Sequence, residues 1–218
     1  MPGHGILRPG SKRAGAGIPL FQPYIAPLAA DVGRVVAAEA PSATAGTSKS
    51  LTIANAKPDP TCGRVLSYSV TVDADADLTA DFITEGVCWY TGETITEEVT
   101  GVTLAGGAQL GGKVFRSITS IDCVTATSAD VDAADRVAVG IGAHFSPHVK
   151  IKATGDVKAA IACAAPATSS AAVDDLAAGG AVTMVDAKQG FAYYTPNDAP
   201  DGATWYWLNI QSTYDGAK

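Results

Sequence analysis

The stretch that decides the fold spans residues 95–142 and reads ITEEVTGVTLAGGAQLGGKVFRSITSIDCVTATSADVDAADRVAVGIG. Its apolar residues come in short runs, which are separated by glycine pairs and by clusters of Ser, Thr and Asp. Short apolar runs with this punctuation are typical of strands and turns. The stretch offers almost no group that could catalyse a reaction, so it predicts a β-rich chain that builds and binds.

Strand patterns continue on both sides of this stretch. The clearest covers residues 64–72, where large apolar side chains alternate with Ser and Thr as in a sheet with one buried face. Residues 156–165 are Ala-rich and suit either a helix or a strand. Trp205 and Trp207 share one face of the last strand, and we expect both of its faces to be buried. Further strands are expected at residues 51–54, 82–83, 87–90, 94–104, 114–124, 136–141, 149–153, 181–185 and 204–210.

The N-terminal part of the chain has a different composition. Residues 1–30 are dominated by Gly, Pro, Ala and basic residues, which favour an extended arm over a helix or a sheet. Residues 31–40 have a weak helical pattern, and residues 41–50 have the composition of a linker.

These boundaries predict how the chain is organised. We expect an arm and linker at residues 1–50 and a β-domain at residues 51–218, either as one unit or as two subdomains at about 51–145 and 146–218. Turn signals recur at about the 8–12-residue spacing of sandwiches and barrels. The predicted fold is all-β: an antiparallel β-sandwich or barrel-like domain with an extended, mostly irregular N-terminal arm.

Charge is distributed unevenly along the 218 residues. The chain has a net charge of −7, which argues against an unpatterned attraction to nucleic acid. Arg8, Lys12 and Arg13 are the only charged residues among the first thirty. The sequence therefore places a basic arm on an acidic body.

Cysteine spacing and hydropathy exclude further classes. The four cysteines lie far apart, without a Cys-x-x-Cys pair or a histidine at ligand spacing, so a zinc site is not expected. Prolines interrupt residues 18–28, the only apolar candidate for a secretory signal, and no run approaches the ~20 apolar residues of a membrane span. We expect a protein made in the cytoplasm, with reduced thiols and no membrane partner.

Two loops resemble ligand-binding motifs without completing them. Residues 107–113 match the G-x-x-x-x-G-K spacing of a phosphate-binding loop, but Val114 stands where Ser or Thr should hold magnesium, so a glycine-rich hairpin turn is favoured. Residues 73–77 carry alternate aspartates like a calcium loop, but Leu78 occupies the position that needs Gly. An acidic turn is the preferred interpretation, and weak calcium binding stays open.

No catalytic arrangement emerges from the remaining polar residues. His144 and His148 flank Pro147, which disfavours the helix that would align them, and no third ligand is evident. A Gly-x-Ser-x-Gly elbow is absent, and the acid pairs at residues 97–98 and 174–175 fit solvated turns and strand faces. We therefore expect no enzyme activity, no metal and no cofactor.

Four segments carry a resemblance to a known class of protein. The segments are ITEEVT at 95–100, KVFRSITSI at 113–121, DRVAVG at 135–140, and YTPNDAPDG at 194–202 leading into an aromatic strand. Their order is similar to that of tailed-bacteriophage virion proteins of the head decoration, or cement, type. The resemblance covers about half of the chain, and its motifs are packing and turn patterns.

The resemblance implies a structural function. A decoration protein binds the outer surface of the assembled head and bridges subunits of the major capsid protein, so the chain would reside on the capsid surface after synthesis in the host cytoplasm. Self-association is also implied, with a trimer as the guess, although a dimer or a monomer fits the sequence equally well. A tail, neck or fibre-base component is the main alternative. A carbohydrate-binding module that uses Trp89, Trp205 and Trp207 is a second one.

The N-terminal arm would supply the contacts with the capsid. Large apolar residues spaced by prolines suit an extended segment that lies along a groove, whereas basic residues suit an acidic capsid surface. An arm that packs on its own domain fits the sequence equally well. The candidate partner-binding residues are Arg8, Lys12, Arg13, Ile18, Leu20, Phe21, Tyr24 and Ile25.

Overall fold

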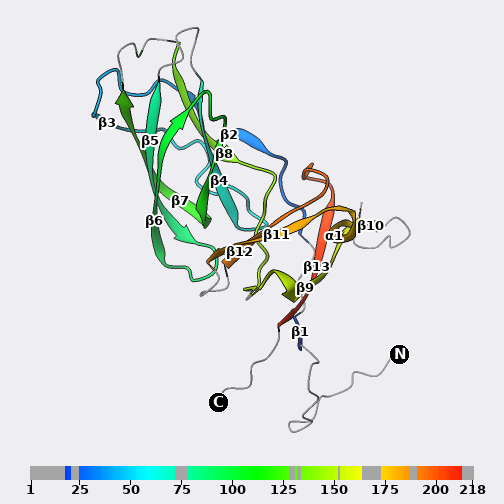
Figure 1. Ribbon diagram of the computed structural model, residues 1–218. Coiled ribbons are helices and arrows are strands. Elements are labelled where there is room, and N and C mark those ends of the chain that lie inside the picture. Colours follow the sequence, from blue (N-terminus) through cyan, green and yellow to red (C-terminus); the bar gives the residue numbers. More distant parts are fainter. Residues whose placement is uncertain are drawn as a thin grey trace, which may run out of the picture.

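The computed structural model describes residues 18–20, 25–71, 78–127, 131, 134–151, 153–163, 173–186 and 191–212. This part of the chain is nearly all β, with antiparallel sheets packed together, which confirms the predicted fold class (Figure 1). Its helical segments are a single turn of 3-10 helix, Thr154–Asp156, and the short α1, Asp175–Ala178. None of its helices is long and apolar enough to cross a membrane. The strands are β1 (Ile18–Leu20), β2 (Asp31–Glu39), β3 (Ser48–Ser50), β4 (Arg64–Thr71), β5 (Thr79–Cys88), β6 (Thr94–Thr103), β7 (Gln109–Thr127), β8 (Arg136–Ile141), β9 (Val157–Cys163), β10 (Val173–Asp174), β11 (Ala181–Asp186), β12 (Phe191–Thr195) and β13 (Trp205–Ser212).

The larger sheet has the order β2-β8-β4-β7-β5-β6, and β3 also pairs with β7. The long strand β7 pairs with three strands: its first residues pair with β4, and its later residues pair with β5 and β3. Strands that pass from one layer to another form the corners of closed sandwiches. The sheet folds over on itself into two layers, so that β4 faces β5 and β6. The hydroxyl of Tyr68 on β4 lies 2.9 Å from Oγ1 of Thr84 on β5 and 3.0 Å from Oε2 of Glu97 on β6.

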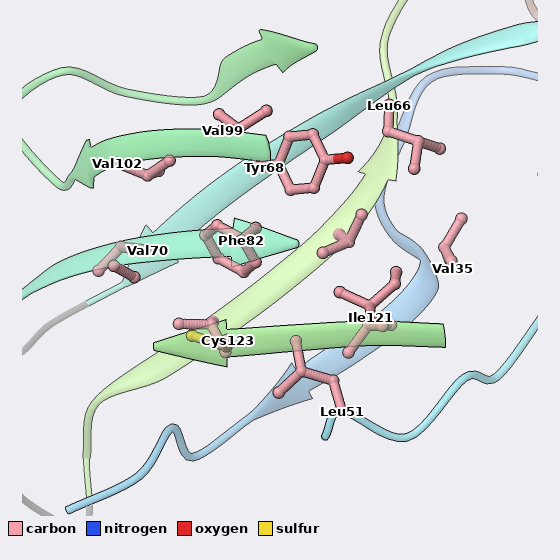
Figure 2. Packing of buried hydrophobic residues seen from close by; sticks show 14 of the residues in the cluster. Val35, Leu51, Leu66, Tyr68, Val70, Phe82, Val99, Val102, Ile121 and Cys123 are labelled. Atoms are coloured by element: carbon pink, nitrogen blue, oxygen red, sulfur yellow. The ribbon is translucent and has the colours of Figure 1, made fainter. Parts of the chain in front are cut away.

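A first hydrophobic core fills the space between these layers. Strand β5 alternates buried and more exposed side chains along its length, as expected for a strand with one face on a core. Figure 2 shows side chains from several strands converging, among them Tyr68, Phe82 and Ile121. The rings of Tyr68 and Phe82 lie 5.1 Å apart, centroid to centroid.

A second core lies against a smaller sheet of order β1-β13-β9-β10 and the hairpin β11-β12. Its centre is aromatic: the ring of Phe145 lies 5.6 Å from that of Tyr194 and 5.3 Å from that of Tyr206. Backbone bridges from Gly63 to Ser146 and from Phe145 to Tyr194 connect it to the larger sheet. The division of the β-domain into one unit or two subdomains stays a prediction.

The structure corrects the expected helix at residues 31–40. These residues form β2, an edge strand that pairs with β8 and buries Val35 and Val36 completely. The unpaired edge of β8 offers hydrogen-bond partners that outweigh the helix propensity of an Ala-rich segment. Residues 31–39 and 48–50, within the range expected to be arm and linker, thus belong to the larger sheet.

Other local predictions are confirmed or corrected in the same way. Residues 64–71 form β4 as predicted, although side chains on both of its faces are buried and not on one face alone. Residues 157–163 form a strand and not a helix. Residues 51–54 and the described residues 149–151 and 153 are not strands, although Leu51 and Ile151 are buried.

Two predictions about turns and faces were wrong. The glycine-rich segment after β6 does turn the chain, with the amide of Gly107 bonded to the carbonyl of Leu104, but it does not close a hairpin, because β5 lies between β6 and β7 in the sheet. Among residues 205–210 of β13 only one face is buried, and Trp205 and Trp207 on the other face stay partly exposed.

Candidate functional site

The base of the N-terminal arm is attached to the body of the protein. Ile25 is 1% exposed in the second core. Its amide donates to the carbonyl of Tyr206 at 2.9 Å, and its carbonyl accepts from the amide of Tyr206 at 2.7 Å. Further toward the N-terminus, β1 pairs with the end of β13, with Leu20 opposite Ile210. This segment of the arm therefore packs on its own chain.

The structure places the predicted arm residues unequally. Ile25 lies in the core and is not on the surface. The backbone of Ile18 and Leu20 forms β1, which is the outermost strand of its sheet within the described residues. The remaining candidates lie outside the described residues: Arg8, Lys12, Arg13, Phe21 and Tyr24.

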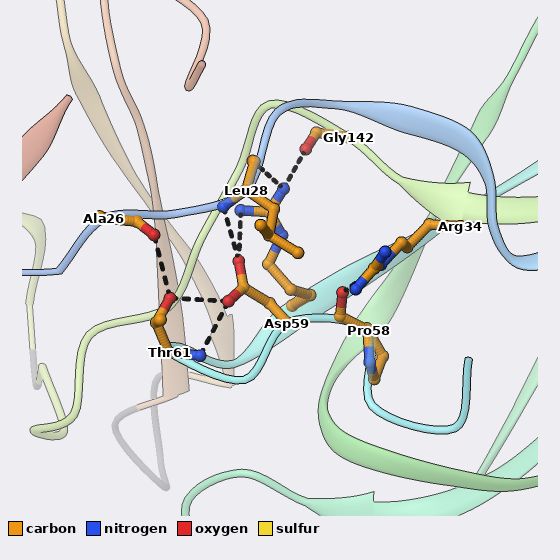
Figure 3. Close-up of polar contacts among 8 residues, drawn as sticks. Ala26, Leu28, Arg34, Pro58, Asp59, Thr61 and Gly142 are labelled. Carbon is orange, nitrogen blue, oxygen red and sulfur yellow. Dashed lines mark hydrogen bonds and ion pairs between the residues drawn. The ribbon is translucent and has the colours of Figure 1, made fainter. Parts of the chain in front are cut away.

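A buried cluster around Asp59 fixes the arm where it meets the larger sheet (Figure 3). Oδ2 of Asp59 accepts from the amide of Leu28 at 2.9 Å, and Oδ1 accepts from the amide of Thr61 at 2.8 Å. Nη2 of Arg64 donates to the carbonyls of Leu28 at 3.1 Å and Gly142 at 2.8 Å. Leu28 is therefore held through both of its backbone polar groups.

An ion pair lies at the centre of this Asp59 cluster. Nη1 of Arg64 is 3.5 Å from Oδ2 of Asp59, and both side chains are fully buried. Burial opposes ionisation of Asp59, but the hydrogen bonds from Thr61 and Leu28 and the charge of Arg64 outweigh it and hold the pKa of the carboxyl below its usual value. Within the described structure Nε and Nη1 of Arg64 have no hydrogen-bond acceptor. The cluster stabilises a connection and presents no free reactive group.

Local sequence explains the position of Asp59. Proline at positions 58 and 60 fixes two backbone angles and removes two amide donors. Asp59 then accepts from the amide two residues later, as Asp commonly does in turns. The two prolines indicate a turn in the sequence, but nothing there marks Arg64 as buried, because a charged residue at the start of an alternating strand resembles a surface residue.

Two acidic residues expected in solvent are buried instead. Glu97 is 4% exposed; its carboxylate accepts from the hydroxyl of Tyr68 at 3.0 Å and from the amide of Gly112 at 2.6 Å. Burial raises the pKa of Glu97 despite these hydrogen bonds. Asp175 is also 4% exposed and accepts from the hydroxyl of Tyr194 at 2.5 Å. Both carboxylates satisfy buried donors across the cores.

The loops singled out for ligand binding have other partners. The amide of Gly112, which a phosphate-binding loop would offer to a ligand, is bonded to Glu97, and the ammonium of Lys113 contacts the carbonyl of Thr96. The acidic segment at residues 73–77 lies outside the described residues. Across the ranges described above, no group of three or more His, Cys, Asp or Glu side chains could hold a metal ion.

The histidines at positions 144 and 148 contact separate aromatic neighbours. Nδ1 of His144 lies 2.8 Å from Oγ1 of Thr195, and the His144 ring lies 4.9 Å from the ring of Tyr193, centroid to centroid. The ring of His148 lies 5.0 Å from that of Trp89. Burial lowers the pKa of both histidines.

The three tryptophans lie in two separate places in the chain. Trp89 follows β5, whereas Trp205 and Trp207 share one face of β13.

Comparisons of the chain with protein-family models, with curated proteins and with solved structures give no match.

Proposed function

We propose that this chain is a structural protein of a tailed-bacteriophage virion. In this proposal it is a head decoration protein that binds the outer surface of the assembled capsid and bridges subunits of the major capsid protein. The observation that carries the proposal is the N-terminal arm, which is basic in sequence. The arm is bonded to the body of the protein at Ile25 and Leu28, and its strand β1 is the outermost strand of the smaller sheet within the described residues.

Bridging requires a fixed origin and enough reach. The Asp59 cluster and the Ile25–Tyr206 bridge supply the fixed origin. The 17 residues before β1 could span at most about 60 Å if fully extended. β1 itself has an unpaired edge within the described sheet, and a strand from a neighbouring subunit can pair with such an edge.

Decoration would stabilise a head by mass action. A protein that binds only the assembled shell shifts the assembly equilibrium toward that shell. Repetition over many symmetric sites multiplies the effect, because each arm that reaches a second subunit binds at a high effective concentration. The absence of a free reactive group in the Asp59 cluster is compatible with this role.

Truncation tests the proposal. A variant that lacks residues 1–17 keeps β1, Ile25 and Leu28, so we expect it to melt at the temperature of the full chain. We expect it to lose co-sedimentation with heads of the phage that encodes it, when those heads are assembled without this protein. Co-sedimentation at the level of the full chain would contradict the proposal. A variant lacking residues 1–28 serves as a contrast, because it should also lose stability.

Copy number separates the head from the alternative locations. A decoration protein should occur in numbers set by the capsid lattice, whereas a neck, tail or fibre-base ring needs only a few copies. Quantitative electrophoresis of purified virions measures this ratio. A trimer in solution, detected by sedimentation equilibrium, would match the local threefold positions of a capsid.

A further inference from the structure

A pocket with a volume of about 400 Å³ opens between the turn before β4, the residues after β5 and the middle of β7. This size falls within the range of small-ligand sites. The residues that matter for binding are Lys57, Trp89, Tyr90, Arg116, Ser117 and His148.

The pocket carries unbalanced positive charge. Lys57 and Arg116 are exposed, and neither forms an ion pair with any residue that the structure describes. Asp59 is the one acidic residue of the lining, and its carboxylate is already bonded to Leu28 and Thr61 and paired with Arg64. Two free cations on a chain with a net charge of −7 form a local site for an anion.

The aromatic wall of the pocket is held in place. Nε1 of Trp89 donates to the carbonyl of Pro147 at 3.1 Å. Its ring packs on the backbone of Gly63, where an added Cβ would lie 2.5 Å from Cγ of the indole. The hydroxyl of Tyr90 donates to the carbonyl of Ala192 at 2.8 Å, and its ring stacks on Phe191 at 4.8 Å. Rings fixed in this way lose little entropy when a ligand binds.

The combination of these groups selects a class of ligand. Arginine binds carboxylate, sulfate and phosphate through a planar fork of donors, and lysine adds a point charge. A sugar ring has an apolar C–H face that suits an indole, and hydroxyls that suit the serine and histidine of the lining. A nucleobase is flat and apolar on both faces, whereas most of this lining is polar.

We propose that this pocket binds an acidic sugar, with the oxyanion between Lys57 and Arg116 and the ring against Trp89. The oxyanion can be a carboxylate, a sulfate or a phosphate. The proposal does not depend on the virion function, because none of the lining residues belongs to β1 and binding needs no capsid.

Titration of the full-length protein tests the proposal. The probes are 3′-sialyllactose, a hyaluronan tetrasaccharide and a heparin tetrasaccharide, with lactose and inorganic phosphate as the neutral and ring-free counterparts. We expect at least one acidic saccharide to shift the Trp89 indole N–H resonance and to bind at least tenfold more tightly than lactose and phosphate. Trp89→Phe assigns that resonance among the three indoles.

Matched charge variants complete the test. Lys57→Gln and Arg116→Gln should each weaken binding about tenfold, whereas Lys158→Gln, on the exposed side of β9, should not change it. Unchanged melting temperatures would show that the variants are folded. The proposal is overturned if no acidic saccharide binds, if lactose or phosphate binds equally well, if the charge variants bind normally, or if a poly-aspartate peptide binds more tightly than every saccharide.

Discussion

Arg64 is the largest side chain that is completely buried in the described structure. Among the described residues, Asp59 alone forms an ion pair with it. Removing one partner of a buried ion pair leaves an unpaired charge in the interior, which costs more than the pair contributes. The arrangement makes the junction between arm and body sensitive to single substitutions. The sensitivity is greatest at Asp59, which also accepts hydrogen bonds from Leu28 and Thr61.

Asp59→Asn is expected to lower the free energy of unfolding by about 3 kcal/mol at pH 7. The folded-state pKa of Asp59 lies below its ordinary value of 3.8, so its contribution is complete well above pH 4 and is lost as the pH falls through the folded pKa. The stability curves of the two proteins should therefore converge in acid. Urea unfolding from pH 3 to pH 7 measures the difference, and a loss that is independent of pH would contradict the assignment.

Sequence reasoning could identify this residue but not its role. The spacing of two prolines around Asp59 predicts a turn, and the structure has one. Leu28 and Gly142, which complete the cluster around Asp59 and Arg64, are distant from both in sequence and reach them only in the folded chain. Glu97 is a parallel case, since the pattern of β6 does not reveal that Tyr68 and Gly112 donate to it.

At the scale of elements, strand existence was more predictable than strand pairing. The hydrophobic pattern predicted β4 by the alternation of apolar and polar residues, and it predicted β6 and β8 by short apolar runs. It does not report which strand lies alongside, so the pairing of β7 with three strands and the edge position of β2 could not be foreseen. The helical pattern of β2 was overridden by pairing with β8, a contact between segments about a hundred residues apart.

The contact between β2 and β8 depends on Gly140. A Cβ atom at this position would overlap the backbone of Asp31 and Val32. Gly140→Ala should therefore separate the two strands and lower stability by about 2 kcal/mol. Gly33→Ala is the matched control in β2, because its Cβ would meet neighbours at ordinary distances of 3.6 Å or more and should cost little. Thermal unfolding followed by circular dichroism compares the variants, and equal effects would contradict this account.

At the scale of the whole molecule, two cores share one chain without a clean boundary. The second core takes Ile25 and Cys62 from the N-terminal half, together with Phe145, Tyr194 and others from later segments. The Tyr90 hydroxyl bonds the backbone of Ala192, adding a link between the two parts. The strand and turn patterns predicted the sheets and left open whether they form one unit or two. The interleaving of segments favours a single unfolding transition.

Cysteine reactivity can decide whether the cores unfold together. Cys62 lies in the second core and Cys123 in the first, and burial raises the pKa of each thiol to about 12. Both should resist a thiol reagent in the folded protein and react only after opening. We would compare two single-cysteine variants, each with the remaining cysteines changed to alanine and with folding checked by circular dichroism.

At each low concentration of urea, the two variants should be labelled at the same rate once any difference in their global stability has been corrected for. The physical reason is that Cys62 precedes Gly63 and Arg64, whose bridge to Ser146 and hydrogen bonds to Leu28 and Gly142 tie the second core to β4. Opening the second core around Cys62 would break these contacts and expose the buried charge of Arg64. Faster labelling of Cys62 than of Cys123 would contradict this coupling and would indicate subdomains that unfold separately.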